Sequence, residues 1–244
     1  MIVKFPYALR DNEMIWIEDI KEVERGAKCR CICPKCKEDL LAKLGVVRIP
    51  HFAHSNKTKC NQEIAYIFSI YKMMEQLLNE EKYIVLPGIF YGFNCEPSQI
   101  EYSWEIKFTS NLNDISSRKH KKELVKERKV EVISTEVVEV NSAQEMALLL
   151  NIENKKLAIK ITPNKKSCRV RKVYPYEHSD ATIGFELDDT SFDPKTLKSI
   201  FIDTSTKKTW LDNKKIQRKI QELKDEGNKL RNKIQTDKKI QKKI

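Results

Sequence analysis

The sequence predicts a mixed α and β fold in three parts: a small cysteine-rich β module, a larger domain of strands and helices, and a basic helical tail. Five of the seven cysteines and two histidines gather between residues 29 and 60. Uninterrupted helical periodicity follows over residues 62–81, and alternating apolar segments typical of strands come after it. We place the three parts at residues 1–61, 62–212 and 213–244, in an α+β or α/β architecture.

The composition bounds the class of protein. Hydrophobic residues make up 40% of the chain and charged residues 33%, which is enough for a packed core under a highly charged surface. No apolar run approaches the ~18 residues that a membrane helix needs, and the first residues show no signal-peptide pattern. The odd number of cysteines also disfavours an oxidised, secreted protein. We therefore expect a soluble, cytoplasmic protein without a membrane partner.

The first part begins with a β-hairpin. Alternating residues from Val3 to Arg10 and from Met14 to Ile17 flank the polar turn Asp11-Asn12. The cysteine-rich stretch follows, and residues 48–54 are expected to form a short strand.

The second part begins with the predicted helix over residues 62–81, whose apolar positions recur every three or four residues without proline or glycine. Strands are predicted at residues 83–87, within 101–140, and at 182–187. A hairpin is predicted from residues 146–150 and 157–161, which bracket a polar turn. A short helix is expected from Pro194 to Phe201.

The basic stretch Arg118–Lys122 and the lysines and arginine after it favour an exposed helix. Glu123 and Glu127 stand among them at a spacing that allows pairing between residues four apart.

The cysteine cluster predicts a metal site. Cys33-Pro-Lys-Cys36 has the spacing at which two thiolates converge on one ion, and a histidine with Cys60 completes a tetrahedral zinc set. His51 and His54 differ by three positions, so an extended strand points them to opposite faces. We favour His54, which is nearer Cys60, with His51 as the alternate.

Other interpretations of the cysteines stay open. They are reduced structural cysteines beside chance histidines, a redox Cys-x-x-Cys motif, or a metal set in which Cys29 or Cys31 replaces a ligand. Cys95 and Cys168 stand alone and read as packed thiols. A closed set of four ligands is structural rather than catalytic, so it does not reveal what the protein does.

The tail carries most of the basic charge. From Asn213 to Ile244 there are 12 Lys and Arg against 4 Asp and Glu, a net +8 out of +11 for the whole chain. Five apolar residues fall near a four-three alternation that predicts about three heptads of coiled coil, with Gly227 in one core position. They are Ile216, Ile220, Leu223, Leu230 and Ile234. The tail can contact a DNA backbone, self-associate or bind a protein partner, or remain solvated.

Taken together, several motifs make the chain resemble the competence protein CoiA-like family. The most specific is Arg48-Ile-Pro-His-Phe-Ala-His54, which follows Cys33-Pro-Lys-Cys36 and precedes Cys60. Looser matches follow as far as residue 213. They are the helix from Glu63 into residues 80–87, then residues 157–162, 184–188 and 207–213. The resemblance implies an N-terminal zinc-finger-like segment, a central domain similar to restriction-endonuclease-like nucleases, and a link to DNA uptake and recombination.

Nucleases of that kind hold Mg²⁺ between an Asp on one strand and a Glu-x-Lys-like pair on the next. This chain departs from the pattern, because Lys160 stands where the family would have glutamate. The preceding strand shows no aspartate, and the nearest acid is Glu145. Glu63 matches a helix glutamate of such nucleases, although an ordinary first-turn acid explains it equally well. Glu63, Glu145 and Lys160 are therefore candidates for a degenerate catalytic site.

Three functions remain as hypotheses. The leading one is a DNA-associated protein that binds DNA or a partner without cleavage. The second is an active nuclease that uses Mg²⁺, and the third is a protein-interaction adaptor that works through residues 213–244.

Overall fold

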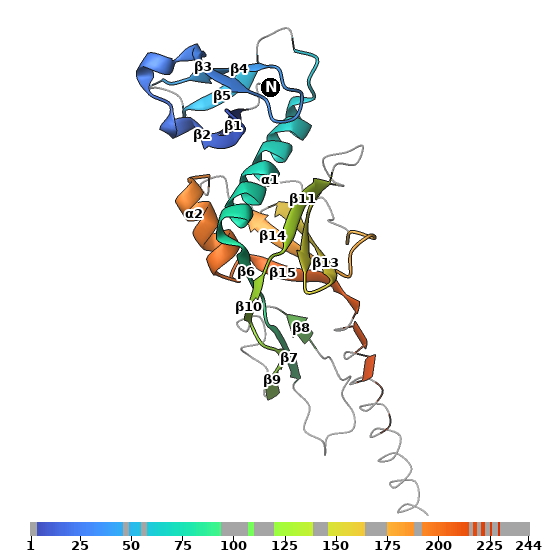
Figure 1. Cartoon of the computed structure of the whole chain (residues 1–244). Helices are drawn as coiled ribbons and strands as arrows, with labels where there is room; N and C mark the ends of the chain where they lie inside the picture. The colour runs from blue at the N-terminus through green and yellow to red at the C-terminus, as the bar shows by residue number, and fades with distance from the viewer. Residues whose placement is uncertain are drawn as a thin grey trace, which may run out of the picture.

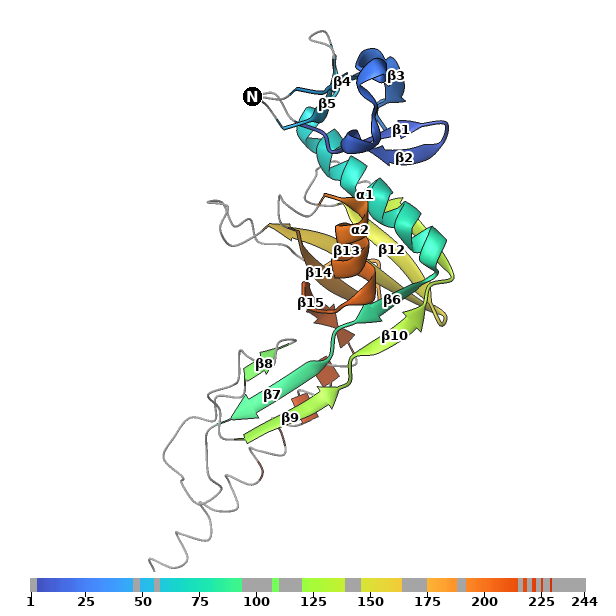
Figure 2. The same cartoon turned by 90° about the vertical axis from the view of Figure 1, so that its left-hand side faces the viewer.

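The computed structural model describes residues 4–45, 49–54, 58–93, 107–109, 120–138, 146–163, 175–187 and 192–214, and six further residues between 217 and 229. Within these ranges the chain has mixed α and β content, as predicted. An N-terminal β module lies at one end, a five-stranded sheet covered by helices lies in the middle, and a small three-stranded sheet extends from it (Figures 1 and 2). The long helix α1 (Gln62–Glu81) runs from the module to the central sheet (Figure 1).

The N-terminal module is one antiparallel sheet in the order β2-β1-β3-β4-β5. Its strands are β1 (Tyr7–Arg10), β2 (Glu13–Trp16), β3 (Gly26–Ile32), β4 (Asp39–Lys43) and β5 (His51–His54). Phe5, just before β1, exchanges two backbone hydrogen bonds with Phe52 of β5, at 2.9 and 3.1 Å. The sheet therefore curls back on its own beginning, around a core that includes Phe5, Phe52 and Leu40.

The predicted hairpin of β1 and β2 is confirmed, and the two residues of its turn suit the backbone conformation that the turn requires. Asp11 and Asn12 both have positive φ, at 52° and 68°. A two-residue turn with two left-handed residues matches the twist of antiparallel strands, and Asp and Asn tolerate this conformation better than most residues.

Helix α1 has the bounds that the sequence predicts. The side chain of its N-cap, Asn61, accepts a hydrogen bond from the backbone N–H of Ile64 at 3.2 Å. Lys82 ends the helix in the left-handed conformation, and its N–H donates to the carbonyl of Leu78. One face of the helix, including Tyr71 and Met74, is buried in the main core.

The central sheet has the order β11-β12-β13-β14-β15 and is antiparallel except for the parallel pair β13–β14. Its strands are β11 (Ser134–Val138), β12 (Ala147–Ile152), β13 (Lys155–Pro163), β14 (Ala181–Leu187) and β15 (Lys208–Asn213). The predicted hairpin of β12 and β13 is confirmed, again with two positive-φ residues, Glu153 and Asn154. The short helix α2 (Pro194–Lys198) is also confirmed, and it continues into a π-helical turn at Ser199–Asp203.

The predicted helix near residues 118–129 is wrong. Residues His120–Val125 form strand β9, which pairs with β7 (Ile89–Phe93), and Arg128–Glu131 form β10, which pairs with β6 (Tyr83–Leu86). Strand β8 (Lys107–Thr109) adds to the other side of β7. Cross-strand pairing overrides the local charge spacing, because Val130 of β10 is buried against Ile84 of β6.

The described residues of the tail after Asn213 are helical, as expected. The five apolar residues predicted to form its seam lie outside the described residues, so the coiled coil stays a prediction. In the part of the chain that the structure describes, no helix combines the length and apolar character needed to cross a membrane.

Two contacts fasten the module to the central domain. The side-chain amide of Gln76 on α1 accepts a hydrogen bond from the N–H of Met14 at 2.6 Å and donates to its carbonyl at 3.4 Å. The fully buried Tyr7 donates its hydroxyl proton to the carbonyl of Phe192, next to α2. These hydrogen bonds join β2 to α1, and β1 to the segment before α2.

A lysine of the central sheet is buried against strand β6. Lys208 of β15 is 1% exposed, and its Nζ donates to the carbonyls of Val85, at 2.8 Å, and Thr204. Burial lowers the pKa of Lys208 to about 7.

Gly184 in β14 has no room for a side chain. A Cβ there would lie 2.8 Å from Cγ2 of Thr162 and 3.1 Å from Cδ2 of Leu211. The β-branched threonine is stiff, so we expect Gly184→Ala to lower the free energy of unfolding by about 1–3 kcal/mol. Urea denaturation measures this, and Gly45→Ala is the matched control because a Cβ at Gly45 meets nothing within 4 Å. Equal stability of the two variants would contradict the tight packing.

Candidate metal centre

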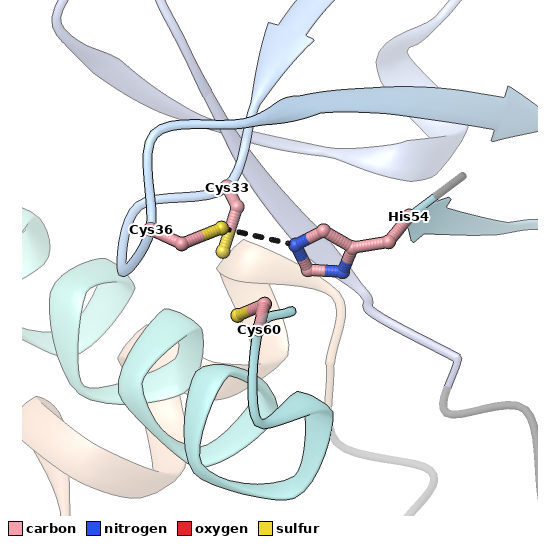
Figure 3. Close-up of side chains that lie close together, drawn as sticks. All are labelled: Cys33, Cys36, His54 and Cys60. Atoms are coloured by element: carbon pink, nitrogen blue, oxygen red, sulfur yellow. Dashed lines mark hydrogen bonds between the residues drawn. The ribbon is translucent and has the colours of Figure 1, made fainter. Parts of the chain in front are cut away.

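Four residues from three segments converge at one end of the module. Cys33 and Cys36 lie on the turn after β3, His54 ends β5, and Cys60 comes directly before the N-cap of α1 (Figure 3). The turn is held by backbone hydrogen bonds from Cys33 N–H to the carbonyl of Glu38, at 2.8 Å, and from Lys37 N–H to the carbonyl of Cys33, at 2.9 Å. The position of each ligand atom is thus set by the backbone on which it stands.

The four ligand atoms lie within 4.8 Å of one another. Sγ of Cys36 and Nε2 of His54 are 3.3 Å apart. A tetrahedral ion, at about 2.3 Å from sulfur and about 2.0–2.1 Å from nitrogen, would separate these two atoms by roughly 3.6 Å. The Cys₃His cluster could therefore hold a metal ion such as zinc with small side-chain adjustments.

The pKa shifts of the cluster are those expected at a site that binds a cation. Burial and the neighbouring thiols raise the pKa of Cys33 and of Cys60, because several thiolates cannot share a buried site unless a positive charge neutralises them. Burial lowers the pKa of His54 and so favours the neutral imidazole, which is the form that binds metals. A bound cation would reverse the penalty on the thiolates.

The orientation of His54 gives a further test. Its Nε2 faces Cys36 (Figure 3), and its Nδ1 is buried without a hydrogen-bond partner among the described residues. One ring nitrogen thus faces a thiol and the other has no partner among the described residues, so hydrogen bonding alone explains this ring orientation poorly. A metal ion at Nε2 explains why this ring is turned toward the sulfurs.

His51 lies apart from the cluster. Its Nδ1 is 2.9 Å from the carbonyl oxygen of Ile49, which gives this nitrogen a backbone partner. The structure therefore brings His54, and not the alternate His51, to the three thiols.

Cys29 and Cys31 also lie outside the cluster. Both are buried in the core of the module. Sγ of Cys29 lies 3.5 Å from the carbonyl oxygen of Leu40, and Sγ of Cys31 lies 3.2 Å from the carbonyl oxygen of Cys29. They act as small apolar core residues here and do not replace any of the four. Cys95 and Cys168 lie outside the described residues.

Two supporting residues were missed by sequence reasoning. The hydroxyl of Thr58 accepts a hydrogen bond from Cys60 N–H at 3.0 Å and donates to Glu38, which ties the segment of Cys60 to the turn of Cys36. The ring of Phe5 meets that of His54 edge-on at 5.2 Å. Thr58 could have been found from the sequence, because its hydroxyl stands two residues before a ligand. The contact of Phe5 with His54 could not, because it depends on the closure of the sheet.

Of the three candidate catalytic residues, Glu63 and Lys160 lie in the described part of the chain, and the catalytic site stays a prediction. Glu63 is exposed in the first turn of α1, and Glu145 lies outside the described residues. Lys160 in β13 is 5% exposed, and strand alternation places it on the face opposite Ile159, whose side chain packs in the core with α1. Strands β12 and β13 contain no aspartate or glutamate.

The geometry defines the first part of the chain as a small, curled β module with a Cys₃His metal-ligand cluster at its junction with a long helix. Residues 16–63 match the family model of the N-terminal domain of competence protein CoiA. The N-terminal segment is thus similar to that domain, and the predicted resemblance is confirmed over residues 16–63. No curated protein and no solved structure matches the chain, and the nuclease-like character of the central domain stays a prediction.

Proposed function

We propose that the cluster of Cys33, Cys36, His54 and Cys60 holds a structural Zn²⁺ ion. Three thiolates and one imidazole are the ligands that zinc prefers, and four protein ligands leave no open position for substrate. Free thiols in such a site suit a reducing compartment, so we place the protein in the cytoplasm. The ion's role would be to fasten the turn of Cys36, the end of β5 and the start of α1 to one another.

We infer further that the protein associates with DNA without cutting it. The observation that supports this is the match to the CoiA N-terminal domain, joined to a central sheet whose strands β12 and β13 lack carboxylates. A lysine such as Lys160 favours a nearby phosphate but cannot ligate Mg²⁺, which requires oxygen ligands. Binding would therefore persist where the hydrolytic chemistry has been lost.

The test uses the purified, zinc-loaded full chain with labelled duplex and single-stranded DNA. At 50 mM salt we expect a mobility shift, and no cleavage after prolonged incubation with Mg²⁺ or Mn²⁺. Glu63→Gln and Glu145→Gln serve as controls, and both variants should bind as the parent does. Metal-dependent cleavage that either substitution abolishes would show an active nuclease instead, and the absence of any shift at low salt would remove the DNA role.

A further inference from the structure

The charge of the N-terminal module is divided between its two halves. Residues 10–24 contain six Asp and Glu against Arg10 and Lys21. Residues 25–60 contain nine Lys and Arg against Glu38 and Asp39. The half that carries the four metal-ligand candidates is therefore strongly basic, although the module as a whole is not.

The fold exposes this positive charge. The register of β3 against β4 jumps from the pair Gly26–Ala42 to the pair Cys31–Leu40, so the residues between bulge out of the ladder. Within the bulge Cys29 points into the core, while Lys28 and Arg30 are exposed.

Two more lysines are next in sequence to metal-ligand candidates. Lys37 is adjacent to Cys36 and Lys59 is adjacent to Cys60, and the Sγ atoms of these two cysteines lie within 4.8 Å of each other. Both lysines are exposed. A hydrogen bond between the side chains of Thr58 and Glu38 joins the two segments on which these lysines stand.

These cations differ from the charged residues of the acidic half. Glu24 of that half pairs with Arg10 at 3.0 Å, and Glu22 pairs with Arg25 of the basic half at 2.9 Å. By contrast, five exposed residues form no ion pair with any carboxylate in the described ranges. They are Lys28, Arg30, Lys37, Lys43 and Lys59. We call this set the basic face.

We infer that the basic face contacts the phosphate backbone of nucleic acid, an inference that rests on the DNA association proposed above. Unpaired, exposed cations neutralise phosphates and release counterions without reading sequence. Binding to an anionic membrane surface normally adds large apolar side chains. In the described parts of this half, Ile49 is the one large apolar residue that is strongly exposed.

The test replaces four of these lysines in the zinc-loaded full chain: Lys28→Gln, Lys37→Asn, Lys43→Gln and Lys59→Gln. Asparagine suits residue 37, whose φ is 64°. The control removes the same charge from exposed lysines of the central domain and its flanks: Lys126→Gln, Lys155→Gln, Lys156→Gln and Lys195→Gln. Zinc content is measured for both variants, and binding to a labelled 30-base-pair duplex is followed by anisotropy from 50 to 250 mM NaCl.

Each lost phosphate contact lowers the slope of log K against log salt by about 0.9, so the first variant should lose about 3–4 in slope and at least tenfold in affinity. The control should keep most of the parent's slope. If the parent binds and the two variants weaken equally, the basic face is overturned while the proposed function stands. If the parent does not bind DNA, both fall. Binding to phosphatidylserine vesicles is measured for the same variants. If the four basic-face substitutions weaken binding to the vesicles but not to DNA, the inference is overturned in favour of a membrane surface.

Discussion

Replacing Cys36 by serine should abolish zinc binding and unfold the N-terminal module while the central sheet stays folded. Cys36 is the thiol nearest His54 Nε2, and its loss leaves three ligands of four. Structural zinc contributes about 10–16 kcal/mol of apparent free energy in zinc-finger peptides, which matches or exceeds the whole stability of a small domain. Elemental analysis should find about one zinc per parent chain and close to none per variant. Amide exchange should then lose protection in β3, β4 and β5 but keep it in β12, β13 and β14.

The controls are the nearby cysteine and histidine outside the cluster. Cys31→Ala and His51→Ala change buried residues of the same module but should retain about one zinc per chain. If Cys36→Ser retained zinc, or if His51→Ala lost it as completely as His54→Ala, the ligand set would be wrong. Chelator treatment of the parent should reproduce the exchange pattern of Cys36→Ser.

Lys208→Met should remove a pH-dependent part of the stability of the central domain. The folded state lowers the pKa of Lys208 to about 7 from its ordinary value of 10.5. Between these values the unfolded chain binds the proton and the folded chain does not, so the parent gains stability as pH rises through this window. Below pH 7 both states are protonated and the penalty of burying the charge is complete. From pH 7 to 9.5 the gain should be about 3 kcal/mol, at 1.36 kcal/mol per pH unit.

The measurement compares urea denaturation of parent and variant at several pH values. Methionine also removes the donor to the carbonyls of Val85 and Thr204, but that loss is the same at every pH. The free energy of unfolding of the parent, relative to that of Lys208→Met, should therefore increase as pH rises. Lys195→Met, at an exposed site, should show no such trend. Parallel curves for parent and Lys208→Met would show that the amine stays charged when buried.

The elements that follow from local patterns were predictable from the sequence. Helix α1 has uninterrupted periodicity and the Asn61 cap, and the hairpins at Asp11-Asn12 and Glu153-Asn154 carry their own turns. The pairing of β9 with β7 and of β10 with β6 was not predictable, because a Lys–Glu spacing of four fits a helix. These strands form through partners that lie 27 to 48 residues away along the chain. Strand β15 was also not predicted, since its six residues include Lys208, whose burial depends on carbonyls from other segments.

The candidate site divides in the same way. The Cys-x-x-Cys spacing predicted two of the four ligand residues, and the positions of His54 and Cys60 along the chain predicted the other two. What the sequence could not supply is the closure of the sheet, which brings Phe5 to His54 and turns His51 toward the carbonyl of Ile49. The exposure of Lys28 and Arg30 in the basic face likewise depends on a bulge, which no local pattern predicts.

The amide of Gln76 also has a consequence for how the protein behaves at high concentration. Strand β2 is the outer strand of its sheet, and an outer strand can recruit a strand of another molecule through its unpaired backbone groups. By occupying both the N–H and the carbonyl of Met14, one glutamine from α1 blocks that recruitment at mid-strand. Whatever loosens α1 from the module would therefore uncover a template for aggregation.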